Sequence, residues 1–100
     1  MPHFDDIHNI FAPNRKLNDA EIIRAIKLGI ASEYESTQIY QQIMESTDNN
    51  DVKIILQGIA EDEMHHAGKL MKLLEILSPL DAKEQQIGIQ KALDILNTGK

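Results

Sequence analysis

Two stretches of the chain carry core-type residues at alternating steps of four and three, the spacing that aligns side chains on one face of an α-helix. Neither stretch contains a proline, so both can form long helices that pack face to face in an all-α fold. We call these two series the seams. The first seam comprises Ile22, Ile26, Gly29, Glu33, Ser36, Tyr40 and Ile43. The second seam comprises Val52, Leu56, Ile59, Glu63, His66, Leu70, Leu73 and Leu77.

Each seam is apolar at its ends and polar in its middle. Glu33 interrupts the first seam, and Glu63 and His66 interrupt the second. A buried carboxylate without a partner is unfavourable, because burial favours its neutral form and raises its pKa. A turn near residue 49 follows Glu33 by 16 residues and precedes Glu63 and His66 by 14 and 17 residues. In an antiparallel hairpin the three side chains therefore lie at one level and can meet.

These three residues are of the types that bind metals. Glu63 and His66 are spaced i, i+3, which places a carboxylate and an imidazole on one helix face, and first-row metal ions accept both. Four-helix bundles with two metal ions use one Glu from each of two helices and a Glu-x-x-His pair from each of the other two. The chain has half of this set. We therefore expect a homodimer that completes the bundle and holds two metal ions, with a polar layer that only fixes helix register as the alternative.

Local signals predict where the first long helix begins and ends. Asn18 and Glu21 have the spacing of a capping box, which starts a helix that extends to about Thr47. Residues 1–17 show no sustained period and are expected to form an irregular arm. The helical domain is then predicted to occupy residues 18–100.

The remaining boundaries follow from turn residues. Asp48-Asn49-Asn50 is a turn signal, with Asn50 expected to cap the second long helix. That helix ends before Ser78-Pro79, because proline and the residue before it disfavour the helical conformation. A third, shorter helix is expected at about 81–96. The chain is thus predicted to be a long antiparallel helical hairpin followed by a short C-terminal helix.

The second long helix carries a further apolar stripe beside its seam. One partner helix cannot cover both, so helices from other copies should cover the rest. We expect a homodimer and, beyond it, a higher homo-oligomer. The stripe comprises Ala60, Met64, Ala67, Met71 and Leu74.

Composition narrows the classes of function. The 100 residues include no cysteine, which excludes disulfides, thiolate metal sites and cysteine nucleophiles. A formal charge of −6 disfavours nucleic acid as a partner. No apolar run reaches the roughly 20 residues that span a bilayer, and the first residues lack the basic and apolar regions of a signal peptide. We expect a cytoplasmic protein that binds neither nucleic acid nor membrane.

Residues 20–77 resemble the ferritin-like superfamily, specifically its single-hairpin members. The stretch 25–35, followed by Ile39-Tyr40, is similar to the first helix of a rubrerythrin half or of an encapsulated ferritin. Residues 59–68 are similar to the metal helix of both. The spacing from Glu33 to Glu63, 30 residues, fits the same pattern.

The resemblance implies iron ligation by Glu33, Glu63 and His66, with two ions at each dimer interface. Manganese or zinc suits the same donors, because ligand type alone separates these metals poorly. The resemblance also places Tyr40 close to the metals. Tyr40 is then either a catalytic participant or a packed tyrosine with a hydrogen bond.

Two further residues are candidate secondary ligands. Encapsulated ferritins have an outer metal site formed by carboxylates beside the first ligand. Glu35 matches one of these carboxylates, but Ser32 occupies the other matching position, which weakens the site. His65 lies outside the seam and is either a secondary metal ligand or a solvated residue.

The function implied by the resemblance is that of a ferroxidase, which oxidises Fe(II) to Fe(III) in iron storage or detoxification. Encapsulated ferritins form dimers that assemble into rings inside an encapsulin-type protein shell, a nanocompartment. One alternative is a rubrerythrin-like peroxidase, although rubrerythrins also use a cysteine-ligated iron domain and this chain has no cysteine. The other alternative is a non-catalytic, metal-binding module that serves helical oligomerisation.

Overall fold

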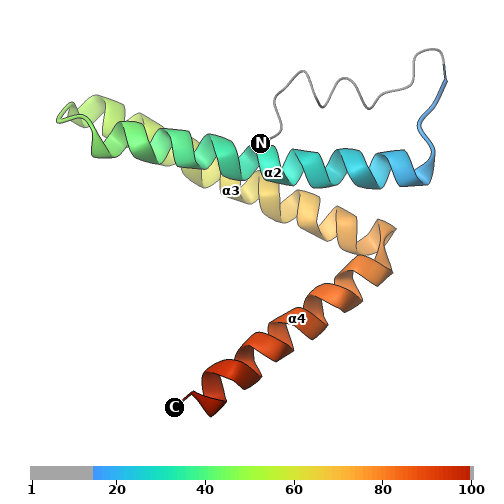
Figure 1. Cartoon of the computed structure of the whole chain (residues 1–100). Helices are drawn as coiled ribbons and strands as arrows, with labels where there is room; N and C mark the ends of the chain where they lie inside the picture. The colour runs from blue at the N-terminus through green and yellow to red at the C-terminus, as the bar shows by residue number, and fades with distance from the viewer. Residues whose placement is uncertain (1–14, 100) are drawn as a thin grey trace.

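The computed structural model describes residues 15–99 and folds them into three helices without a strand. α2 comprises Asp19–Glu45, α3 comprises Asn50–Leu77 and α4 comprises Pro79–Thr98. α2 and α3 lie side by side in an antiparallel hairpin, whereas α4 diverges from the end of α3 to give a V-shaped outline (Figure 1). The all-α hairpin with a C-terminal helix is confirmed. The predicted arm, residues 1–17, lies almost entirely outside the described residues.

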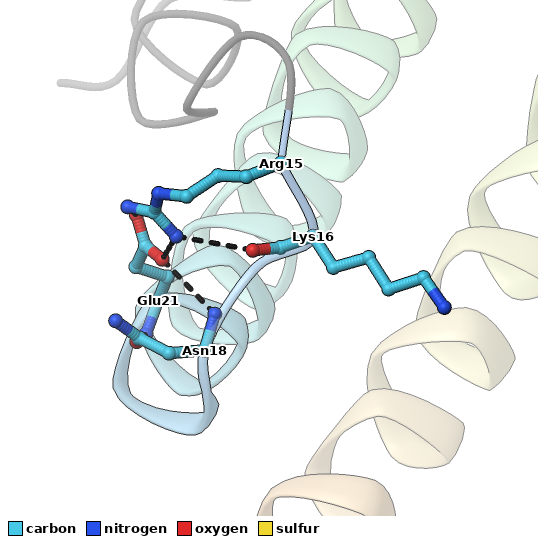
Figure 2. Close-up of polar contacts among 4 residues, drawn as sticks. All are labelled: Arg15, Lys16, Asn18 and Glu21. Atoms are coloured by element: carbon cyan, nitrogen blue, oxygen red, sulfur yellow. Dashed lines mark hydrogen bonds and ion pairs between the residues drawn. The ribbon is translucent and has the colours of Figure 1, made fainter.

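The predicted capping box fixes the start of α2. The Asn18 side chain accepts a hydrogen bond from the backbone N–H of Glu21 at 2.9 Å, and the Glu21 carboxylate accepts one from the N–H of Asn18 at 3.0 Å. Arg15 donates two further hydrogen bonds to the same carboxylate, at 2.7 and 2.9 Å (Figure 2). The first N–H groups of a helix have no partner within it, so this cluster stabilises the first turn.

The turn between α2 and α3 differs from the prediction by one residue. Asn49, not Asn50, is the N-cap of α3, and its side chain accepts a hydrogen bond from the N–H of Val52 at 3.2 Å. Asn49 has the extended backbone of an N-cap (φ −73°, ψ 110°), whereas Asn50 is already helical. Two adjacent asparagines give the same sequence signal, which explains the error. α2 also ends earlier than predicted, at Glu45.

The hairpin packs along a stripe of mostly small side chains. The buried residues of α3 are Ala60, Ala67 and Leu74. A Cβ added at Gly29 of α2 would lie 3.3 Å from Leu70 Cδ1 of α3, so the two helices are also close at that level. Small side chains at a helix contact permit a short interaxial distance, and they determine which side of α3 faces α2.

The predicted seams are buried only in part: Ile26 is 8% exposed and Gly29 lies close to Leu70, but other seam residues are open to solvent. Leu73, Leu77 and Ile43 are 43%, 41% and 43% exposed. Three members of the further apolar stripe, Ala60, Ala67 and Leu74, are buried within the chain, whereas Met71 is 48% exposed. The physical reason is volume, because alanines allow a closer approach than leucines do. Leu73 and Leu77 are left exposed, where a further helix can cover them.

Ser78 and Pro79 form the elbow between α3 and α4. Pro79 is the first residue of α4, where its missing N–H is not needed. Asp81 accepts a hydrogen bond from the Ser78 hydroxyl and pairs with Lys27 of α2 at 3.2 Å. α4 contains the helix predicted at about 81–96 and extends it at both ends. No helix within the described part of the chain is long and apolar enough to cross a membrane.

Candidate metal centre

Glu33, Glu63 and His66 converge on one point at the edge of the hairpin. One ligand-type atom from each of them lies within 4.8 Å of those of the other two. Glu33 Oε2 and His66 Nδ1 are 3.6 Å apart. Among residues 15–99 no other group of three histidines or carboxylates comes together in this way. The structure thus brings together the residues that the interrupted seams single out, and we call them the triad.

One side of the triad is shielded from solvent and the other side is exposed. The Glu33 side chain is 20% exposed, whereas that of His66 is 52% exposed. Glu33 Oε2 is buried, and no hydrogen-bond partner for it exists among the described residues. A buried polar atom without a partner destabilises a fold by about 1–3 kcal/mol. A cation bound by the triad would supply the missing partner, so the donor set fits a metal ion.

The electrostatics of Glu33 support the same interpretation. Burial raises the pKa of Glu33 above its ordinary value, and the neighbouring Glu63 carboxylate raises it further, while His66 lowers it. The two carboxylates therefore repel each other, and His66 offsets this repulsion only in part. A divalent cation favours the ionised form of both carboxylates and binds the neutral imidazole.

The helix around Glu33 is held by contacts at the same level. Gly29 and Leu70, whose close approach fixes the spacing of α2 and α3, lie about one turn from Glu33 and from His66 respectively. Thr37 donates its hydroxyl to the Glu33 carbonyl at 2.9 Å. Gly29 and Leu70 both stand in the predicted seams, where the glycine is a signal of close helix approach, whereas no pattern in the sequence singles out Thr37.

The remaining candidates lie outside the triad. Glu35 is partly exposed on α2, and Ser32, beside it in the expected outer site, donates its hydroxyl to the Leu28 carbonyl at 3.0 Å. His65 is exposed and lines a groove on the other side of the hairpin. Tyr40 is partly exposed on α2, about two turns beyond Glu33. None of them joins the group of converging ligands within residues 15–99.

Comparison with known proteins agrees with the all-helical fold. The rubrerythrin family model matches residues 15–92. The encapsulin nanocompartment cargo protein EncC of Myxococcus xanthus is 32% identical over 91% of this chain and 68% of that protein. The ferritin-like-encapsulin shell fusion protein of Pyrococcus furiosus is 27% identical over 75% of this chain but only 22% of the fusion.

No solved structure matches the chain at a significant level. The family match spans most of the chain and includes all three triad residues. The similarity to EncC extends over nine-tenths of the chain. The chain therefore belongs to the rubrerythrin family of ferritin-like proteins.

Proposed function

We propose that this protein is a ferroxidase that oxidises Fe(II) to Fe(III) at a two-iron site shared between two copies of the chain. The observation that carries the proposal is the buried Glu33 Oε2, which has no hydrogen-bond partner among residues 15–99, inside a Glu-Glu-His triad. A single triad offers few ligands, and its His66 side is open. A second copy packed against that side by a two-fold axis would add the same three side chains and complete a four-helix bundle.

Each residue of the triad would contribute a donor atom to the iron site. Iron supplies the redox chemistry, since each Fe(II) gives up one electron to dioxygen or to peroxide. Glu33 and Glu63 would provide negative charge that favours Fe(III) over Fe(II). The neutral His66 imidazole would add a nitrogen donor. The exposed seam leucines at the edge of the hairpin would exclude water once the second copy covers them.

The relatives support a proposal about where in the cell this oxidation takes place. One is named as the cargo of an encapsulin nanocompartment, and the other joins a ferritin-like part to an encapsulin shell in a single chain. We propose that this chain likewise works inside a protein shell in the cytoplasm, where the iron that it oxidises is stored or made harmless. A hairpin dimer has no cavity of its own in which to keep a mineral.

A peroxidase is the second candidate, and the match to the rubrerythrin family favours it. The two candidates differ in the oxidant, because a ferroxidase of the storage type turns over with dioxygen and a peroxidase prefers peroxide. Stopped-flow mixing of the Fe(II)-loaded protein with each oxidant in turn separates them. If manganese or zinc is the native metal, the protein should bind that metal more tightly than Fe(II), and no oxidation should follow in air.

The deciding experiment is an anaerobic Fe(II) titration of the apo-protein with molar mass followed by light scattering. Air is then admitted, and Fe(III) absorbance is recorded. We expect two irons per dimer and rapid oxidation, both lost in Glu63→Ala. Glu61→Ala is the matched control, because Glu61 lies on the same helix but outside the triad, against Gln57. Binding that is absent, or equal in the two variants, would leave only a helical oligomerisation module.

A further inference from the structure

A groove lies between α2 and α3 on the side of the hairpin away from the triad. It holds about 280 Å³, and no triad residue lines it. Gln57 and Met64, which do line it, lie roughly 180° and 160° around α3 from His66, at about 100° per residue. We call this hollow the back groove.

The back groove has an apolar floor and a polar rim. Met44, Ala60 and Met64 are wholly or partly buried in it, whereas Gln41 and Gln57 are exposed beside them. Sites for small molecules commonly combine an apolar lining with a few polar groups. The floor of the back groove therefore suits a small apolar molecule.

One layer of side chains separates the back groove from the carboxylates of the triad. Thr37 follows Glu33 by four residues, and Ala60 precedes Glu63 by three. Residues three or four apart are neighbours on a helix surface, with about 5–6 Å between their Cβ atoms. Both Thr37 and Ala60 line the back groove, and Ala60 is only 7% exposed. A molecule in the groove is thus about one side chain away from Glu33 and Glu63.

Fe(II) and dioxygen need different routes to the triad. A charged ion crosses apolar surroundings only at a high cost in free energy, so Fe(II) needs the polar side of the triad, where His66 is 52% exposed. In the proposed dimer that side lies between the two copies, and the back groove stays outside the interface. Dioxygen is small and apolar, and it passes readily from water into apolar surroundings.

We propose that dioxygen reaches the iron site from the back groove, through the layer formed by Thr37, Ala60 and Met64. The proposal rests on the proposed function, because it names dioxygen as the oxidant of that same site. Methionine is unbranched and flexible, and the rotamers of exposed side chains change within picoseconds to nanoseconds. Such changes open the layer to a diatomic molecule without moving the helices. Hydrogen peroxide is polar and gains little from an apolar floor, so this path favours dioxygen.

Dissolved dioxygen tests the path in the iron-free protein, because dioxygen is paramagnetic and speeds the nuclear relaxation of groups that it approaches. Relaxation of the methyl groups is measured in the full-length apo-protein under nitrogen and under dioxygen pressure. We expect a several-fold larger effect at the Ala60 methyl than at the Ala67 methyl, and Met64→Phe should remove most of this difference. Ala67 is the matched control, because it is buried about two turns further along α3 and does not line the back groove.

The same substitution at two places along the back groove tests the path in the iron-loaded protein. Met64→Phe adds bulk at the layer, whereas Met44→Phe adds it in the same groove, about 16 Å along α2 from Glu33. Protein loaded with Fe(II) under anaerobic conditions is mixed with increasing concentrations of dioxygen. Met64→Phe should need at least about fivefold more dioxygen to reach half of its limiting rate, which corresponds to about 1 kcal/mol in the barrier to entry.

The other properties of Met64→Phe should match those of the wild type. These properties are the limiting rate at high dioxygen, the number of Fe(II) ions bound and the rate of oxidation by hydrogen peroxide. Met44→Phe should match the wild type in every measurement. Thr37→Ala thins the layer and should react faster than the wild type at low dioxygen. A faster reaction cannot result from misfolding, so this variant decides the matter even if Met64→Phe folds poorly.

Three outcomes would overturn the path. Equal relaxation effects at Ala60 and Ala67 would show that dioxygen does not reach the layer. Identical kinetics in Met64→Phe, Met44→Phe and the wild type would place the entrance elsewhere. An equal loss of rate with dioxygen and with peroxide would show that Met64→Phe changes the iron site and not access to it. Each of these results, in a protein that still oxidises iron, refutes the path alone, whereas a wild-type protein that binds no iron refutes the proposed function as well.

Discussion

Glu21 and Glu33 lie on the same helix and are both shielded from water, yet their surroundings have opposite effects. Their side chains are 10% and 20% exposed. Hydrogen bonds from Arg15 and from the backbone of Asn18 lower the pKa of Glu21 to about 2, whereas burial and Glu63 raise the pKa of Glu33. The partners, and not the burial, distinguish a carboxylate that stabilises the fold from one that is available to bind a cation.

The largest expected effect separates the two glutamates by function. Glu33→Gln should slow Fe(II) oxidation at least about 100-fold. Loss of a residue that only supports a metal ligand typically costs about 10- to 100-fold, so a loss of this size indicates a direct ligand. Glu21→Gln should leave the rate within about twofold, because Glu21 contacts only the start of α2. The rates are measured from Fe(III) absorbance at equal iron loading. Equal losses in both variants would remove the distinction between them.

A smaller effect is expected on the stability of the apo-protein. Because the pKa of Glu33 is raised on folding, ionisation of Glu33 at pH 7 opposes folding. Apo Glu33→Gln should therefore melt about 4 °C higher at pH 7, corresponding to roughly 1 kcal/mol in a domain of this size. The difference should disappear below pH 4, where the carboxyl is protonated in both folded and unfolded chains. A lower melting temperature at pH 7 would show that Glu33 has a partner in the apo-protein.

Glu21 should show the opposite dependence on pH. Its pKa falls from 4.5 to about 2 on folding, so ionised Glu21 stabilises the protein above pH 4.5, and this contribution is lost as the pH falls toward 2. Glu21→Gln should thus melt below the wild type at pH 7 and approach it near pH 2. Circular dichroism melts at pH 7, 4 and 2.5 measure this change. A constant difference in melting temperature across that range would mean that the interaction between Arg15 and Glu21 does not depend on the charge of the Glu21 carboxylate.

The smallest effect concerns how closely the helices are held at the level of Glu33. Alanine in place of a helical glycine adds about 0.5–1 kcal/mol of stability where there is space. Gly58 has no heavy atom within 4 Å of an added Cβ, whereas Gly29 has Leu70 Cδ1 at 3.3 Å. Gly58→Ala should show the full gain in urea unfolding, and Gly29→Ala about half of it or less. Equal gains would mean that Leu70 moves aside freely.

The sequence was sufficient to predict the helices and the meeting of the triad. Periodicity indicated two long helices, Asn18 and Glu21 indicated the first start, and equal distances from the turn placed Glu33 level with Glu63. These features depend on the spacing of residues along the chain, which can be read directly from the sequence. The prediction that the triad residues are ligands stays a prediction until a metal is measured.

Other features depend on three-dimensional packing and could not be predicted in the same way. Whether α3 buries Ala67 or Leu73 more deeply depends on competing volumes, and the periodicity fits either stripe. The direction of α4 depends on how Asp81 meets Lys27, two residues 54 positions apart. Only the structure shows that Glu33 Oε2 lacks a hydrogen-bond partner within the described part of the chain, because that fact depends on all of its neighbours.

The level arrangement of the triad across the short turn between α2 and α3 constrains how this chain can change during evolution. Residues added at the tip of the turn, near Asp48, leave the distances along both helices untouched. A single insertion or deletion within α3 between Asn50 and Glu63 would rotate both of its ligands by about 100° and shift them by about 1.5 Å. Variation in length should therefore accumulate at the tip, while the segments from there to the ligands keep a fixed length.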